Sequence, residues 1–135
     1  MAVLIKLRQS KFSEQNGGGK WFAQTVSTGE VHTNDIARRI EENSTFKHGE
    51  VLGLISELVE TMTHELKMGK TVVLDGFGRF RLVAESQGVS SPKEFNIKKH
   101  IKGVRCNFLP ASERDSQTRK LSSPLSKDTE IRWKK

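Results

Sequence analysis

The longest regular pattern in the sequence is a helical repeat over residues 47–67. Apolar side chains recur there at intervals of three and four residues, which predicts a long amphipathic helix. The members of this stripe are Val51, Leu54, Ile55, Leu58, Met62 and Leu66. Leu52 and Val59 widen the apolar arc beyond one core-facing stripe. The helix is therefore expected either between two layers of one core or in a seam between two chains, and the pattern favours neither.

The composition also favours a hydrophobic core that is shared with a second chain. Hydrophobic residues make up 34% of the 135 residues and the mean hydropathy is −0.55, which is lean for a chain that closes a core alone. The net charge of +7 favours an anionic partner, either nucleic acid, an acidic protein or a membrane surface. Residues 71–135 hold 14 basic and 7 acidic side chains, whereas residues 32–70 hold 5 and 7. A polyanion is therefore expected to contact the part after the helices.

A shorter helix is predicted upstream, over residues 33–43. Thr33 or Asn34 can cap its N-terminus, and Asp35 suits the positive end of the helix dipole. Its apolar face is expected to hold Ile36, Ala37 and Ile40.

Residues 71–82, with the sequence TVVLDGFGRFRL, place two glycines in a stretch that otherwise has strand character. Asp75-Gly76 is a strong tight-turn signal between apolar runs, so we expect a β-hairpin around DGFG. In a hairpin Phe77 and Phe80 can both face the core, which alternation along one strand would forbid. The residues that then face away from that core, toward solvent or a ligand, are Arg79 and Arg81.

From residue 83 the chain is first polar and then basic. Phe95, Ile97 and Ile101 are interleaved with the basic residues, which are Lys93, Lys98, Lys99, His100 and Lys102. A strand that returns to the core is predicted over residues 104–109. A short helix is predicted over residues 111–121, and a basic, mobile tail is predicted for the rest of the chain.

Residues 2–8 and 20–27 predict two strands joined as a β-hairpin by a long connection. Asn16 and the three glycines after it can supply positive φ angles at low cost. A phosphate-binding P-loop is the alternative for GGGK, but Trp21 follows the lysine and no helix begins there. Trp21 or Phe22 is expected to cover the sheet, or else to contact a partner.

The order of these elements, and above all LKMGKTVVLDGFGRFRL at residues 66–82, resembles the HU/IHF family of bacterial histone-like DNA-binding proteins. That family has a similar helix end, a glycine, a short strand and a Gly-Phe-Gly-x-Phe signature, which here is residues 76–80. The resemblance covers residues 33–120. With its added N-terminal strand pair, the chain looks like the variant HU-type proteins of Bacteroidetes.

The resemblance implies an α+β, HU/IHF-like fold. In it, two N-terminal helices precede an antiparallel sheet with a β-arm, an extra N-terminal β-hairpin is added, and two chains intertwine as a homodimer. It divides the chain into an N-terminal extension at residues 1–31, an HU-like DNA-binding domain at 32–121 and the tail at 122–135. The implied dimer core is formed by Leu54, Ile55, Leu58, Met62, Phe77 and Phe80.

The resemblance also implies a function, which is sequence-tolerant binding of double-stranded DNA by a nucleoid-associated architectural protein that condenses DNA. Such dimers grip the duplex with two β-arms, each carrying a proline wedge near its tip. Pro92 lies at nearly the matching distance from Gly76, although residues 83–92 hold no basic residue. The candidate DNA contacts are Arg79, Arg81, Pro92, Lys93, Lys98, Lys99, Lys102 and Arg105.

The sequence leaves one alternative function open and favours no other. A protein- or RNA-binding module on the same fold, using the N-terminal hairpin, is the alternative. An enzyme is not expected, because no nucleophile, base and orienting group can be assembled and the four histidines lack metal-ligand spacing. No cofactor, metal, membrane or small-molecule substrate is expected. Cys106 is expected as a small buried strand residue. A cytoplasmic location at the nucleoid is expected, since no signal-peptide core or membrane span is visible.

Overall fold

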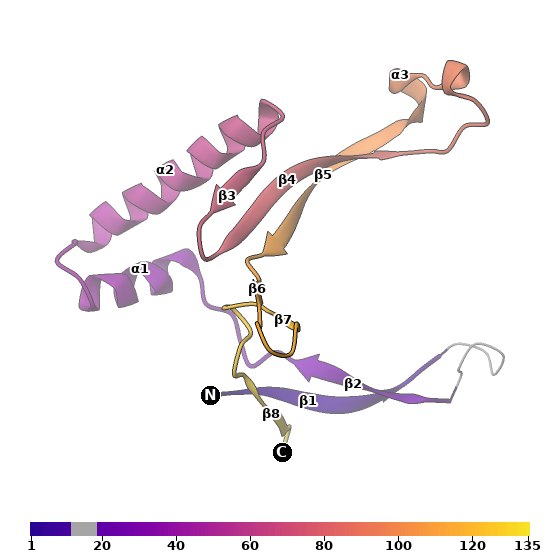
Figure 1. Ribbon diagram of the computed structural model, residues 1–135. Coiled ribbons are helices and arrows are strands. Elements are labelled where there is room, and N and C mark those ends of the chain that lie inside the picture. The colour runs from indigo at the N-terminus through magenta and orange to yellow at the C-terminus, as the bar shows by residue number, and fades with distance from the viewer. Residues whose placement is uncertain (12–18) are drawn as a thin grey trace.

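The computed structural model describes residues 1–11 and 19–135. Its elements in chain order are β1 (Ala2–Gln9), β2 (Trp21–Val26), α1 (Thr33–Glu42), α2 (His48–Lys67), β3 (Val72–Leu74), β4 (Gly78–Ser86), the 3-10 turn η2 (Pro92–Glu94), α3 (Ile97–His100), β5 (Ile101–Pro110), β6 (Glu113–Arg114), β7 (Leu121–Ser122) and β8 (Glu130–Trp133). Figure 1 shows α1 and α2 on one side and a long arm, made of β4 and β5, that extends away from them. The predicted mixed α+β class is confirmed.

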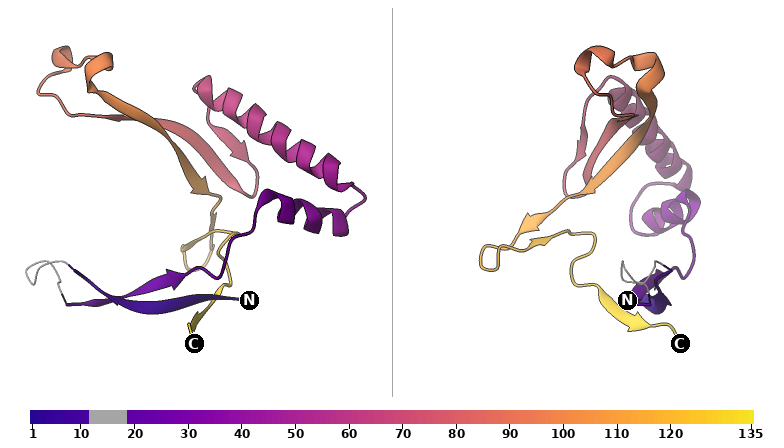
Figure 2. Two further views of the ribbon diagram at one scale, coloured as in Figure 1. Left: turned by 180° about the vertical axis from the view of Figure 1, so that it is seen from behind. Right: turned by 90° about the vertical axis from the view of Figure 1, so that its right-hand side faces the viewer.

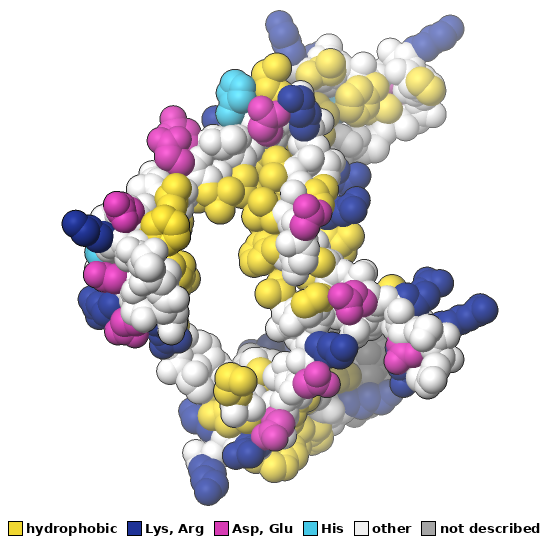
Figure 3. All heavy atoms as spheres, turned by 60° about the vertical axis from the view of Figure 1, so that its left-hand side comes forward, with side chains coloured by type: hydrophobic (Ala, Val, Ile, Leu, Met, Phe, Trp, Pro, Cys, Tyr) yellow, Lys and Arg dark blue, Asp and Glu magenta, His cyan; other side chains and the backbone are white. Residues whose placement is uncertain are grey.

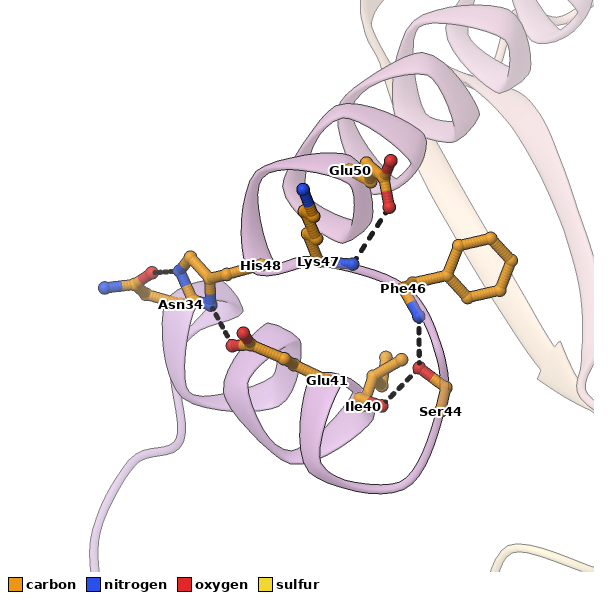
Figure 4. A network of polar contacts seen from close by, with 8 residues as sticks. All are labelled: Asn34, Ile40, Glu41, Ser44, Phe46, Lys47, His48 and Glu50. Atoms are coloured by element: carbon orange, nitrogen blue, oxygen red, sulfur yellow. Dashed lines mark hydrogen bonds and ion pairs between the residues drawn. The ribbon is translucent and has the colours of Figure 1, made fainter.

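The two long helices fall where the sequence predicts helices, and their junction is fixed by polar contacts (Figure 4). His48 links the helices, because its Nε2 lies 2.6 Å from the Asn34 side-chain oxygen and its Nδ1 lies 3.6 Å from the Glu41 carboxylate. The N–H of Lys47 donates to the Glu50 carboxylate at 2.9 Å, which satisfies one orphan donor at the start of α2. The ring of Phe46 points away from this network.

The glycines in residues 71–82 have two separate roles. Gly76 has a φ of +75° in the turn between β3 and β4, and the N–H of Phe77 donates to the carbonyl of Leu74 at 3.0 Å. A positive φ at the third turn position favours glycine. Gly78 begins β4 at a φ of +156°, and a Cβ there would lie 2.5 Å from the Phe108 ring and 2.6 Å from the Leu109 carbonyl oxygen. Gly78 therefore allows β5 to lie against β4.

Strands β3, β4 and β5 form an antiparallel sheet that packs against α2. Its apolar face holds a cluster of three rings, with centroid distances of 6.1 Å for Phe77–Phe80, 5.4 Å for Phe77–Phe108 and 4.8 Å for Phe80–Phe108. These spacings are typical of favourable aromatic pairs.

The chain termini meet in a second sheet of order β2–β1–β8. Strands β1 and β2 form the antiparallel hairpin that the sequence predicts, whereas β8 pairs parallel with β1. The predicted connection at Asn16, Gly17 and Gly18 lies outside the described residues. The sequence predicts a mobile tail for residues 122–135, but the structure places β8 within it. The reason is the alternation of Ile131 and Trp133 with polar residues, which suits a strand.

Four other expectations differ from the structure. The expected helix over residues 111–121 is a hairpin of β6 and β7, because Asp115 accepts turn hydrogen bonds from Gln117 and Thr118. Cys106 is exposed rather than buried. Trp21 and Phe22 are both exposed, so neither is part of a core in this chain. A third helix, α3, follows the two predicted ones at the tip of the arm.

The chain has little interior of its own. Its accessible surface is 11999 Å² for 15.2 kDa, whereas a compact monomer of this mass exposes about 7100 Å². The buried hydrophobic residues in the described part are only Ala37, Val51 and Leu66. Figure 3 shows hydrophobic side chains gathered around an opening through the molecule, while Lys and Arg side chains stand at its outer projections. A single chain therefore leaves an apolar interior open.

Candidate nucleic-acid interface

One face of the β4–β5 sheet is basic. In the register of this pair, Arg79 is the partner of Leu109, Arg81 of Asn107, and Arg105 of Val83. Because paired residues lie on the same face and neighbours along a strand alternate, the three arginines share one face. The ring cluster of Phe80 and Phe108 lies on the other. The sequence-based expectation that Arg79 and Arg81 face away from Phe80 thus holds in the sheet.

This arginine face carries a shallow groove of about 390 Å³, lined by Thr71, Arg79, Arg81, Asn107, Phe108 and Leu109. Arg105 lies farther along the arm, where its Nε is 3.4 Å from the Glu85 carboxylate. Both side chains of that pair are well exposed, so the ion pair contributes little stability. Another anion can therefore replace Glu85 beside Arg105. Arg79 and Arg81 form no ion pair with any residue in the described part of the chain.

The arm tip is a compact cap between β4 and β5. Pro92 is exposed at the first position of η2, where its fixed φ suits the turn. Asn96 caps α3, since its side-chain oxygen accepts from the N–H of Lys98 at 2.9 Å. Its own N–H donates to Nδ1 of His100 at 2.8 Å, and the rings of His100 and Phe95 lie 5.5 Å apart. These contacts give the tip a defined shape.

The lysines predicted to bind DNA gather on this tip. The cap holds Lys93, Lys98 and Lys99, Lys102 lies next to it at the start of β5, and all four are exposed. Residues 83–92, in β4 and the loop after it, carry no positive charge, whereas the paired strand β5 carries Arg105 opposite Val83 and Lys102 three residues nearer the tip. The predicted contacts therefore run along the arm, with Arg79 and Arg81 near the body, Arg105 farther out on β5 and the four lysines at or beside the tip.

The residues implied as a dimer core differ in their exposure. Leu54 is 58% exposed, Leu58 44% and Phe77 43%. Ile55, Met62 and Phe80 are half-buried. The apolar stripe of α2 is therefore exposed enough in one chain to pack against a second apolar surface.

Basic residues outside the predicted set were missed because their position depends on strand register. Lys6 and Arg8 alternate with Ile5 and Leu7 in β1, and Arg132 joins them from β8. The alternation of charged and apolar residues in β1 was the available signal. The pairing of β1 with β8 joins strands from the two ends of the chain, and no local sequence pattern predicts it.

A family model described as "HU domain fused to wHTH, Ig, or Glycine-rich motif" matches residues 1–123. The chain belongs to this HU-HIG family. The resemblance to HU-type proteins is thereby confirmed, and the match includes the N-terminal hairpin. A comparison of the HU-HIG chain with curated proteins finds no match.

A solved structure with a similar fold is described as a "Putative bacterial DNA binding protein from Bacteroides vulgatus". The two chains superpose with a TM-score of 0.61 at 14% sequence identity, over 98% of the HU-HIG chain and 47% of the other. The HU-HIG chain therefore spans about half the length of that protein. At this level of identity the likeness concerns the fold alone.

Two further observations bear on the type of site. Within the described residues, no three His, Cys, Asp or Glu side chains are grouped closely enough to hold a metal ion. None of the helices there is long and apolar enough to cross a membrane.

Proposed function

We propose that this HU-HIG chain binds double-stranded DNA with little sequence preference, as a homodimeric architectural protein of the nucleoid. The observation that carries the proposal is that the arm carries an arginine face and a lysine-rich tip, on a member of an HU-domain family. Both groups are exposed, and both present charges suited to phosphates.

The arginines and lysines have different roles in this proposal. Contacts to phosphates position a protein on the duplex without reading its sequence. The exposed lysines of the tip, Lys93, Lys98, Lys99 and Lys102, neutralise phosphates along the arm. The planar guanidinium groups of Arg79, Arg81 and Arg105 grip phosphate oxygens nearer the body. Pro92 stands at the tip as the residue that contacts the base stack where the duplex bends.

The open interior supports the proposed homodimer. The surface in excess of a compact monomer is far larger than a standard interface requires, and Leu54 and Leu58 of α2 lie on it. A second copy that inserts its own α2 and sheet would cover this surface and the ring cluster together. Dimerisation also duplicates the arm, so that two arms reach the same duplex.

The test is a titration of a fluorescent duplex of about 30 base pairs at several salt concentrations, where log affinity falls linearly with log salt for a phosphate binder. We expect similar affinities for unrelated sequences. The triple variant Lys98→Ala, Lys99→Ala, Lys102→Ala should weaken binding to every duplex alike and lower the slope by about 0.9 per lost contact.

The matched control removes three charges from the helical body, in the variant Arg38→Ala, Arg39→Ala, Lys67→Ala, and should leave the slope nearly unchanged. Absence of binding by the unaltered protein at low salt would overturn DNA binding. Equal slopes for the two triple variants would overturn the role of the arm tip.

A protein-binding role is the second candidate, favoured by one observation. Trp21, Ile131 and Trp133 are each more than 60% exposed on one face of the sheet β2–β1–β8. Exposed apolar faces of this kind mark interaction sites. The variant Trp21→Ser, Trp133→Ser tests it, because DNA affinity should stay unchanged while association with a protein partner is lost.

A further inference from the structure

The face of the sheet β2–β1–β8 opposite its exposed tryptophans is basic. In the register of β1 with β2, Arg8 is the partner of Phe22 and Lys6 is the partner of Gln24. In the parallel pair, Leu4 is the partner of Arg132. Because partners share a face and neighbours along a strand alternate, these side chains stand together. This basic face consists of Lys6, Arg8, Phe22, Gln24 and Arg132.

The charge on this face is mostly uncompensated. In the sequence, residues 1–27 contain four basic residues, Lys6, Arg8, Lys11 and Lys20, and one acidic residue, Glu14. Arg132 has a partner, since its guanidinium lies 2.8 Å from the Glu130 carboxylate. Lys6 and Arg8 form no ion pair with any described residue. The hairpin therefore presents a local positive charge that attracts an anion.

The end of this face is concave. A groove of about 490 Å³ lies over the hairpin. Its lining residues are Arg8, Gln9, Ser10, Lys11, Phe22, Ala23 and Gln24. Guanidinium, ammonium and amide groups are hydrogen-bond donors to phosphate oxygens, and the 57% exposed ring of Phe22 offers an apolar surface to a sugar. Donors of this kind around an exposed ring match the chemistry of a nucleic-acid backbone.

The hairpin also lies in a suitable place. The β1–β2 hairpin and the β4–β5 arm project to the same side of the molecule, with the arm above and the hairpin below (Figures 1 and 2). In the view along this direction, the two projections stand one above the other. A long polyanion held by the arm therefore passes the side of the molecule from which the hairpin extends.

We propose that the β1–β2 hairpin is a second DNA-contacting element, which binds duplex phosphates through Lys6, Arg8, Lys11 and Lys20. This inference rests on the proposed function, because it extends DNA binding from the arm to the N-terminal extension. It assigns to residues 1–31 a role in lengthening the contact with the duplex rather than in reading bases.

The test compares double variants in the full chain, using duplexes of increasing length. The variant Lys6→Gln, Arg8→Gln removes two charges from the face, and the variant Lys11→Gln, Lys20→Gln removes two charges near its end. The second variant keeps the test valid if the first perturbs β1. The control Arg38→Gln, Lys67→Gln removes the same net charge from exposed positions on α1 and α2.

We expect each hairpin variant to lower the slope of log affinity against log salt by about 0.9 per lost phosphate contact and to shorten the protected DNA, while the control changes neither. If both hairpin variants match the control while the unaltered protein binds DNA, the hairpin proposal is overturned and the proposed function stands. If the unaltered protein binds no duplex at all, the proposed function itself fails, and this outcome is distinct from the first.

Discussion

The sheet β3–β4–β5 and the sheet β2–β1–β8 divide their side chains between two faces in the same way. Each has three strands, one basic face and one apolar face. In the first sheet the basic face holds arginines of β4 and β5, and in the second it holds Lys6, Arg8 and Arg132. The apolar faces differ in what covers them. Helix α2 packs against β3 and β4, whereas no described element packs on the apolar face of the second sheet.

The difference shows what alternation along a strand can and cannot determine. Alternation assigns side chains to two faces, because neighbouring side chains point in opposite directions. It does not determine whether the apolar face becomes a core. Leu82 of β4 is half-buried, whereas Leu7 of β1 is 51% exposed, although both lie in an alternating strand. Burial depends on which sheet a helix packs against. Helix α2, which precedes β3 in the chain, packs against the first sheet.

The largest expected effect comes from a charge placed on the apolar stripe of α2, the helix that packs on the first sheet. If α2 forms the dimer seam, Leu58→Glu leaves an unpaired charge in a buried interface and costs about 3–5 kcal/mol. We expect loss of the dimer, measured by light scattering and by the concentration dependence of unfolding. The control Glu57→Gln on the same helix should leave the assembly unchanged. A Leu58→Glu protein that remains dimeric would exclude α2 from the seam.

A smaller but still large effect is expected at Gly78, within the first sheet. Replacement by alanine brings a Cβ against the Phe108 ring and the Leu109 carbonyl in a conformation that disfavours side chains. We expect Gly78→Ala to lower the free energy of unfolding by about 2–4 kcal/mol, as overpacking and backbone strain combine.

Gly88→Ala is the matched control for that change. A Cβ at Gly88 would meet no atom within 4 Å, so its effect should stay within about 0.5 kcal/mol. Both variants are measured by denaturant unfolding at one protein concentration. Equal midpoints for the two would mean that β5 does not approach Gly78 closely.

Matched truncations compare the two apolar faces directly. Leu82→Ala should cost about 2–3 kcal/mol, because Leu82 lies in the sheet that packs on α2. Leu7→Ala should cost less than about 1 kcal/mol, because half of its surface is already exposed. Thermal and denaturant unfolding measure both. A cost at Leu7 equal to that at Leu82 would show that the assembled protein covers the second sheet.

The comparison also separates what the sequence predicts from what it does not. The turn at Asp75-Gly76 and the helices α1 and α2 are visible in the sequence because local rules decide them: turn chemistry and a repeat of three and four residues. The role of Gly78 in strand approach is not visible, because its contacts come from Phe108 and Leu109, 30 residues farther along the chain.

The candidate site is predictable to a similar degree. The lysine tip follows from the cluster in the sequence, and the arginine face follows from alternation around Phe80. The second basic face does not follow, because Arg132 reaches it through a parallel pairing of the two chain ends. The helix expected over residues 111–121 fails for a local reason, since Asp115 competes for backbone N–H groups and forms a turn.

The smallest expected effect lies at this turn, in the link between the two sheets. The backbone N–H groups of Thr118 and Gln117 donate to the Asp115 carboxylate and hold its pKa below the usual value of 3.8. Because the folded pKa is lowered, the stabilisation is present above the unfolded pKa and is lost as the pH falls through the folded pKa. The amide signals of Gln117 and Thr118 should therefore titrate together at a pH below 3.8. The Asp115→Asn variant should remove this titration while both sheets keep their amide protection. If protection in the sheet β2–β1–β8 fell with that in the turn, the link would be part of the second sheet's stability, and the two sheets would not be independent.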